Sequence, residues 1–250
     1  MFSATMSNVK TMRDSIDTIS QLIDEGLFNI KPDGLELVAT DRAMVAVIDF
    51  KLASSSFDNY EFEKETSMAL NLINLLTILK RASNNDKLIM QLDEENSKLK
   101  LKIEGSYTRS FYIPLLEINA DDIPPISQLD FPASATLDSS IISQGISDAD
   151  IIADSVIIKL TPEGFSMNAE GDSSKTKLDI GKDVDVLSEL NVKEDVQARY
   201  PLDYLKKIIK ASRLADTAKI QMGNDYPMKI EFKGEGVSMS MVIAPRVSEE

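Results

Sequence analysis

The 250-residue chain contains no cysteine and no histidine. Without cysteine it can form no disulfide, no thiolate nucleophile and no cysteine-bound zinc site. Without histidine it lacks the most common general base and metal ligand, and every Ser-His or Cys-His arrangement for nucleophilic catalysis. The motifs GxGxxG and GxxxxGKS/T, which bind nucleotide phosphates, are also missing. We therefore expect a protein that is not an enzyme and that has no catalytic residue and no cofactor.

The chain also lacks any apolar run near the roughly 18 residues that a membrane-spanning helix requires. It begins at Met1 with a strand-like segment and not with a signal peptide. Because 43% of its residues are hydrophobic, it can still bury a substantial core. These features predict a soluble intracellular protein without a membrane partner.

Acidic residues are in excess, with 41 Asp and Glu against 27 Lys and Arg and a net charge of −14. The acids are scattered and include no metal-binding spacing such as an EF-hand loop. We predict no metal site, although a magnesium ion held by carboxylates alone stays an alternative. A negative net charge disfavours nucleic acid as a partner unless the basic residues gather on one surface.

A short motif occurs twice, about 130 residues apart: Pro32-Asp33-Gly34-Leu35 returns as Pro162-Glu163-Gly164-Phe165. In the same way, Ala4-Thr5-Met6 returns as Ala135-Thr136-Leu137. This period is too long for a solenoid, whose repeats have roughly 20–50 residues. The repetition indicates two copies of one domain within the chain.

We place the two domains at residues 1–116 and 133–250, joined by a connecting strap at residues 117–132. The strap is acidic and contains three prolines but no basic residue, which is typical of a semi-rigid extended linker. Its isoleucines and leucine either pin the strap to the body of the protein or form an apolar lip beside a docking groove. The residues alone leave both interpretations open.

Each copy shows two helical periodicities among short alternating strands. The helices are predicted at residues 9–23 and 70–82 in the first copy, and at 138–148 in the second, where Gly145 interrupts the pattern. The second helix of the second copy is predicted to carry Pro201 in its first turn. This pattern predicts an α+β fold in which helices cover one face of each sheet.

Cations lie opposite the apolar stripe of three of these four helices. Lys206, Lys210 and Arg213 recur at helical spacing. The remaining cations of these faces are Lys207, Lys80, Arg81, Lys10 and Arg13. They are either an ordinary solvated surface or a surface that faces phosphates. No aromatic residue interleaves the lysines, so contact with the duplex backbone, without base readout, fits better than stacking on single strands.

Four segments carry a resemblance to a known family: Gly34–Val45, the strap region Leu115–Pro132, Pro227–Phe232 and Ile243–Val247. Together they resemble the DNA sliding clamp family, in particular proliferating cell nuclear antigen of the archaeal type. The resemblance covers essentially the whole chain in order. It implies two similar domains of short-stranded antiparallel sheets with two helices each (the DNA clamp fold), assembled as a pseudo-sixfold trimeric ring.

The resemblance also implies a function in DNA replication and repair. Such a clamp encircles double-stranded DNA regardless of sequence and acts as a processivity factor. The DNA-facing residues carried over are Lys10, Arg13, Lys80, Arg81, Arg109, Lys206, Lys207, Lys210 and Arg213. The helix at 138–148 departs from the family pattern because it carries no cation, which makes the DNA-facing charge uneven.

DNA polymerase, the clamp loader, flap endonuclease and DNA ligase are implied partners, each docking through a short peptide in a groove under the strap. The implied groove residues are Thr40, Met44, Val45, Val47, Ile123, Ile126, Pro227, Val242, Ala244, Pro245 and Arg246, with Met44, Val45 and Val47 on the loop after Asp41. The prolines allow more than one register for the strap. Edge strands are implied to close the ring through Ser110, Phe111, Ile113, Thr176, Leu178 and Ile180.

Several alternatives stay open from the sequence. The ring can be a homotrimer or a heterotrimer, and the chain can be a specialised subunit of a heteromeric or checkpoint-type clamp. A carboxylate-metal nuclease is a candidate of a different class, and a protein-interaction scaffold without DNA is a third. The expected location is the cytoplasm, associated with the nucleoid, in an archaeon, or the nucleus in a eukaryote.

Overall fold

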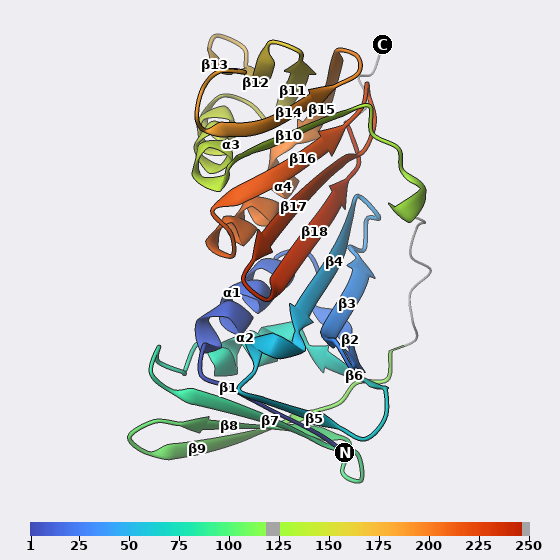
Figure 1. Ribbon diagram of the computed structural model, residues 1–250, viewed down its shortest axis with the longest axis vertical. Coiled ribbons are helices and arrows are strands. Elements are labelled where there is room, and N and C mark those ends of the chain that lie inside the picture. The colour runs from blue at the N-terminus through green and yellow to red at the C-terminus, as the bar shows by residue number, and fades with distance from the viewer. Residues whose placement is uncertain (119–125, 247–250) are drawn as a thin grey trace. The chain divides into compact units, whose positions relative to one another are not determined.

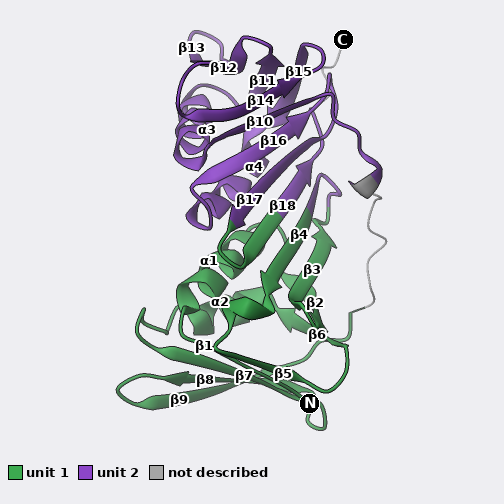
Figure 2. Ribbon diagram, viewed as in Figure 1, with its two compact units in different colours: residues 1–42, 48–123, 234–239 green, residues 43–47, 124–233, 240–250 purple. Residues whose placement is uncertain are grey.

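The structure, a computed structural model, describes residues 1–118 and 126–246. The chain divides into two compact units (Figure 2). The first unit comprises residues 1–42, 48–123 and 234–239, and the second comprises 43–47, 124–233 and 240–250. Each unit therefore includes a short segment from the other half of the sequence.

The first unit contains a five-stranded antiparallel sheet in the order β5-β1-β7-β8-β9 (Figure 1). Its strands are β1 (Phe2–Met6), β5 (Asn59–Phe62), β7 (Lys87–Asp93), β8 (Lys98–Glu104) and β9 (Thr108–Pro114). Along β8, Leu99, Leu101 and Ile103 are buried while the lysines between them are not, because successive side chains of a strand point to opposite faces. The buried residues form the core under the helices.

The other elements of the first unit are strands of a second sheet, two α-helices and a 3-10 turn. The strands follow the order β4-β3-β2-β6. Their bounds are β2 (Glu25–Lys31), β3 (Gly34–Thr40), β4 (Ala46–Ala53) and β6 (Thr66–Asn71). The helices α1 (Val9–Ile19) and α2 (Leu72–Leu79) pack against each other, and η1 spans Ser54–Ser56.

The second unit repeats this plan. A four-stranded antiparallel sheet has the order β13-β12-β11-β15, and a further run of strands has the order β14-β10-β16-β17. Their bounds are β10 (Ala133–Asp138), β11 (Ser155–Thr161), β12 (Gly164–Glu170), β13 (Lys175–Gly181), β14 (Leu187–Val192), β15 (Val196–Pro201), β16 (Thr217–Met222) and β17 (Met228–Gly234). The last strand, β18 (Val237–Ile243), is divided between the two units, and so is β4, whose first two residues belong to the second unit. The helical elements are η2 (Ile126–Gln128), α3 (Ser139–Ile152), α4 (Leu202–Ile208) and η3 (Ile209–Arg213).

The two copies of the Pro-acid-Gly motif form equivalent turns. Gly34 has φ of 140° and Gly164 has φ of 152°, a region that side chains rarely adopt. An added Cβ would also meet a backbone carbonyl, that of Leu52 at the first glycine and that of Ile180 at the second. Only glycine fits both positions, so the motif repeats because the turn repeats.

The helices α2 and α4 also begin in the same way. The backbone N–H of Leu72 donates to the carbonyl of Asp24 at 2.8 Å, and that of Leu202 donates to the carbonyl of Asp154 at 2.9 Å. Each bond satisfies a donor at the helix start that has no partner within the helix. The internal repeat expected from the sequence is thus present at the level of single hydrogen bonds.

Gly145 does not interrupt α3, contrary to the sequence-based expectation. The helix runs from Ser139 to Ile152, four residues beyond the predicted end. A Cβ at Gly145 would lie 2.8 Å from the sulfur of Met167 and 2.9 Å from Cδ2 of Leu178. The glycine therefore lets the helix approach β12 and β13 closely, a tertiary requirement that helix propensity does not reveal.

The predicted second helix of the second copy is also corrected. Pro201 is the last residue of β15 and precedes α4 with φ −71° and ψ 127°, so it is extended and not in the first turn. After Ile208 the α-helix changes to the 3-10 helix η3, which has about 3.0 residues per turn. Lys206, Lys210 and Arg213 therefore do not lie on one regular α-helical stripe. The remaining helix bounds, α1 to Ile19 and α2 from Leu72 to Leu79, are shorter than predicted.

Candidate functional site

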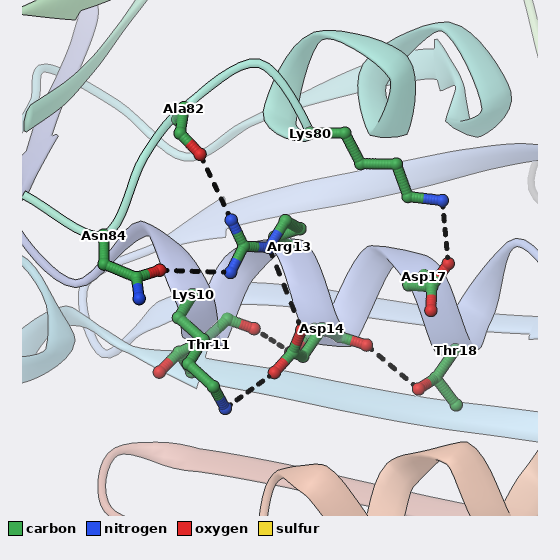
Figure 3. A network of polar contacts seen from close by, with 10 residues as sticks. Lys10, Thr11, Arg13, Asp14, Asp17, Thr18, Lys80, Ala82 and Asn84 are labelled. Atoms are coloured by element: carbon green, nitrogen blue, oxygen red, sulfur yellow. Dashed lines mark hydrogen bonds and ion pairs between the residues drawn. The ribbon is translucent and has the colours of Figure 1, made fainter. Parts of the chain in front are cut away.

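The helices of the first unit present a cationic face built over two carboxylates (Figure 3). Lys10 Nζ lies 2.8 Å from Asp14 Oδ2, and Lys80 Nζ lies 3.3 Å from Asp17 Oδ1. Arg13 donates to the carbonyl of Ala82 at 3.2 Å, and its Nε lies 4.0 Å from Asp14 Oδ1. Arg81, next to Lys80 at the end of α2, is exposed. Three of the four predicted cations of these two helices, Lys10, Arg13 and Lys80, are thus gathered around the two carboxylates.

Arg109, a predicted DNA-facing residue on β9, is engaged within its own unit. Its Nη2 donates to Asp86 Oδ2 at 2.7 Å and its Nη1 donates to the carbonyl of Arg81 at 2.8 Å. Its guanidinium carbon also lies 5.2 Å from the centre of the Tyr107 ring. Hydrogen bonds from Ser83 and the charge of Arg109 lower the pKa of the Asp86 carboxyl. The arginine therefore ties the end of α2 to the edge strand β9.

The cations of the second unit are arranged differently. Lys206 Nζ lies 2.8 Å from Asp150 Oδ1, and Lys207 Nζ lies 5.0 Å from the centre of the Tyr204 ring. Lys210 is half-buried and Arg213 is exposed, both on η3. The neighbouring helix α3 exposes Ser140, Gln144, Ser147, Asp148 and Asp150 and no cation. Among the described helical segments of this unit, the cations are therefore confined to α4 and η3.

A cleft of about 780 Å³ in the second unit brings together four of the predicted groove residues: Val45, Ala244, Pro245 and Arg246. The remaining lining comes from the end of α3 and the two residues after it (150–154) and from Pro201, Leu202, Asp203, Tyr204 and Lys206. The sequence interpretation missed this second group. The internal repeat could have drawn attention to this second group of residues. Pro201 and Tyr204 lie at the start of α4, the repeated helix on which the sequence already placed the cations.

Two segments of the cleft wall are joined by hydrogen bonds. The backbone N–H of Ala244 donates to the carbonyl of Val45 at 2.9 Å. Arg246 Nη1 lies 2.6 Å from Asp154 Oδ2, and this hydrogen bond is the main reason why the pKa of the Asp154 carboxyl is lowered. These contacts fix the C-terminal segment to Val45 at Ala244 and to Asp154 at Arg246. Apolar side chains line the cleft between these two points.

Two large apolar side chains of the same unit are exposed to solvent. Ile151 is 81% exposed at the end of α3, and Met44 is 65% exposed. Met44 also has φ of 56°, which is uncommon for a residue other than glycine. Ile151 lines the cleft, and Met44 precedes the lining residue Val45 in the sequence.

The other predicted groove residues lie elsewhere. Val47 and Val242 are 7% and 6% exposed and belong to β4 and β18, so Val47 is not on a loop as expected and both side chains are in the core. Ile126 and Pro227 are half-buried and do not line the cleft. Thr40 ends β3 in the first unit. Ile123 lies outside the described residues.

The predicted ring-closing segments are both edge strands. β9 ends the five-stranded sheet and β13 ends the four-stranded sheet, and their alternating burial is the same at each of seven positions. Phe111 and Leu178 are half-buried at equivalent positions, while Ser110 is exposed and Thr176 is half-buried. Ile113 and Ile180 are 3% and 5% exposed. These two isoleucines belong to the core of their own units, so only their backbone is available at the strand edge.

Two further observations concern the described residues only. Within residues 1–118 and 126–246 no group of three or more Asp or Glu side chains is placed to hold a metal ion. No helix in this part of the chain is long and apolar enough to cross a membrane.

Known proteins match this chain over nearly its whole length. The structure of proliferating cell nuclear antigen from Thermococcus kodakaraensis superposes with a TM-score of 0.91 at 26% identity, over 98% of this chain and 100% of that one. The proliferating cell nuclear antigen of Entamoeba histolytica has the same fold, with a TM-score of 0.90 at 23% identity over 98% and 99% of the two chains. The fold is therefore that of a two-domain DNA clamp.

The sequence comparisons define the family. The N-terminal domain model of proliferating cell nuclear antigen matches residues 1–122, and the C-terminal domain model matches residues 125–247. A DNA polymerase sliding clamp of Methanococcoides burtonii is 36% identical over 100% of both chains, and one of Pyrococcus furiosus is 31% identical over 99% of both. The chain belongs to the proliferating cell nuclear antigen family.

Proposed function

We propose that this protein is a DNA sliding clamp, a non-catalytic processivity factor that closes as a ring around duplex DNA and holds a polymerase on it. The observation that carries the proposal is the match to both clamp domains over 1–122 and 125–247. It is supported by the cations that gather on helix faces in a chain whose net charge is −14. Such a clamp acts at the chromosome, which in an archaeon lies in the cytoplasm.

The mechanism is topological. A closed ring cannot leave DNA without opening or reaching an end, so its contacts with phosphates can be weak. Strong contacts release many counterions and give tight, salt-dependent binding, which would hinder sliding. An acidic exterior also repels the DNA backbone, so the duplex is favoured only where the cationic helices lie.

The ring is proposed to contain three subunits, joined between β9 of one and β13 of the next. The support is that both are edge strands with the same burial pattern. Edge strands expose unpaired backbone groups that another strand can pair with, and a head-to-tail contact that closes by rotation generates a ring. Identical chains or closely related ones can occupy the three places.

Partner enzymes are proposed to dock short peptides in the cleft of the second unit. Its lining combines apolar residues with fixed polar groups at the rim, such as Asp154 paired with Arg246. This composition is typical of sites that bind an apolar anchor and set its orientation by a few polar contacts. DNA polymerase, the clamp loader, flap endonuclease and DNA ligase are the proposed partners.

The proposed function predicts that retention on DNA depends on DNA topology. Clamps loaded on nicked circular DNA by a clamp loader are expected to stay bound through gel filtration in high salt. Cutting the circle should release them, because the ring slides off the new ends. The measurement is the fraction of clamp that elutes with DNA before and after cutting. Equal loss from circular and linear DNA would mean that contact, and not enclosure, holds the protein.

The peptide site predicts a loss of partner affinity when its wall is truncated. Changing Met44 and Val45 together to Ala removes apolar contact while leaving the Val45 carbonyl bonded to Ala244. A peptide from the docking segment of a partner polymerase should bind about ten- to a hundredfold more weakly, because few buried anchors carry most of such affinity. Calorimetric titration measures it, with Ile73→Ala on α2 as an exposed apolar control. Unchanged affinity would move the docking site away from this cleft.

A further inference from the structure

Asp14 and Asp17 occupy an unusual place on the cationic face of the first unit. Their side chains are only 10% and 13% exposed, whereas those of Lys10 and Lys80 are each 56% exposed. The carboxylates are thus poorly exposed while the two lysines reach solvent, and Figure 3 shows the contacts that join them. Both acids are on helix α1, which also carries Arg13. The lysines of the proposed DNA-binding face are therefore already paired with carboxylates of the same face.

The two carboxylates cancel a large part of the local charge. Three cations of this face, Lys10, Arg13 and Lys80, stand against Asp14 and Asp17, so two of their three formal positive charges are offset. Because water reaches these carboxylates poorly, it screens their attraction for the cations less than at an exposed pair. A phosphate that approaches Lys10 or Lys80 must therefore compete with a carboxylate that already lies close to the ammonium group.

We propose that Asp14 and Asp17 are positioning residues that limit the strength of DNA contact, holding Lys10, Arg13 and Lys80 so that each binds phosphate weakly. The inference rests on the proposed clamp function and adds how its DNA-facing surface is tuned. Sliding requires that positive charge attracts the duplex to the centre of the ring without binding it tightly. Removing the carboxylates should make the clamp bind DNA more tightly and slide more slowly.

The test uses the full-length protein in its native assembly and a short duplex with open ends, which needs no loader. Asp14→Asn and Asp17→Asn keep the side-chain shape and remove the charge. The double variant should bind the duplex about three- to tenfold more tightly at low salt. Its plot of log affinity against log salt should also be steeper, by roughly 0.9 for each additional phosphate that the protein neutralises. On loaded circles, single-molecule tracking should show slower diffusion.

Two matched variants separate this effect from a general change of charge. Asp24→Asn removes a carboxylate that lies 3.3 Å from Arg42 Nη2, outside the helices and the cleft, and is 59% exposed. Glu163→Gln removes one that pairs with Lys182 at 3.1 Å and is 80% exposed. Each should change duplex affinity by less than about twofold, because water already screens these pairs. An equal gain in all variants would overturn the proposal, as would unchanged or weaker binding by the Asp14 and Asp17 variants.

A double-mutant cycle measures the coupling between Lys10 and Asp14, which a merely structural role of Asp14 would not change. Lys10→Met should cost more affinity in the Asp14→Asn background than in the unmodified protein, because only there is Lys10 released toward phosphate. If Asp14→Asn does not fold, the cycle of Asp17→Asn with Lys80→Met answers the same question. Equal costs in both backgrounds would refute the inference.

Failure of the proposed function is distinguishable from failure of this inference. Changing Lys10 and Lys80 to Glu reverses the proposed phosphate-binding groups directly. If that change leaves duplex affinity intact, this face does not bind DNA and the inference falls, whereas the proposed clamp function falls only if the clamp is lost equally from circular and cut DNA. If it weakens binding while the Asp→Asn variants behave like the unmodified protein, only the tuning role of Asp14 and Asp17 is wrong.

Discussion

Phe111→Glu is expected to convert a three-subunit ring into monomers. Phe111 is a half-buried side chain on β9, which ends its sheet. Placing a carboxylate without a partner inside a strand-to-strand interface costs about 3–5 kcal/mol, which weakens each contact by at least a hundredfold. The native mass should fall from about three times 27.7 kDa to 27.7 kDa. Native mass spectrometry or light scattering measures it.

Two companion variants make this result specific. Leu178→Glu, at the equivalent position of β13, should have the same effect from the other side of the interface. Tyr112→Glu lies on the opposite face of β9 and is 59% exposed, so it should leave the assembly intact. Circular dichroism must show that each variant is folded, since Leu178 lies close to Gly145 of α3. A protein that is monomeric before any substitution contradicts the proposed ring.

Reversing the charge of Lys206, Lys207 and Lys210 is expected to abolish the stimulation of polymerase processivity. Three Lys→Glu changes shift the charge of each subunit by −6. Among the described residues of the second unit, α4 and its continuation η3 are the only helical segments that carry cations. Phosphate contacts supply sequence-independent affinity for DNA, and like charges repel the duplex from the ring. Lys206→Glu also places two carboxylates together, because Asp150 lies 2.8 Å from the lysine Nζ.

A graded series tests the electrostatic cause. The corresponding Lys→Gln variant removes three charges and should retain part of the activity. Trimer mass should be unchanged in both, and added salt should reduce the difference between Gln and Lys because it screens exposed charges. The measurement is the length of DNA product on a singly primed template. Full processivity in the Glu variant at moderate salt would mean that these lysines serve only as surface groups.

Patterns within a short stretch of chain predicted most elements of the fold. Leu99, Leu101 and Ile103 alternate with lysines in the sequence, a pattern typical of a half-buried strand, and β8 is one. Within the helix predicted at residues 9–23, Val9, Met12 and Ile16 have the spacing of one helix face, and all three are buried on α1. Such patterns are reliable because the period of a helix or strand fixes which side chains share a face. They fail at element ends, where α1 and α2 are shorter than their apolar periodicity.

The candidate site was only partly predictable. The cations on α1, α2 and α4 could be located because they lie opposite an apolar stripe in the sequence. The i,i+4 spacing of Lys10 and Asp14 could have predicted that pair, whereas the burial of Asp14 and the pairing of Lys80 with Asp17 needed the fold. Likewise Arg109 was predicted to face DNA, and the structure adds its engagement with Asp86 and the Arg81 carbonyl.

The sequence by itself determined that this protein has two copies of one α+β domain, no histidine or cysteine chemistry, and cationic helices in an acidic chain. The tertiary structure alone decided that Val45, Tyr204 and Pro245 line one cleft, that Gly145 lets α3 lie close to its sheet, and that Asp17 of α1 pairs with Lys80 at the end of α2. The physical reason is the range of the interactions. Periodicity and turn chemistry act between near neighbours, whereas clefts, close approaches and buried ion pairs join residues that only the folded chain brings together.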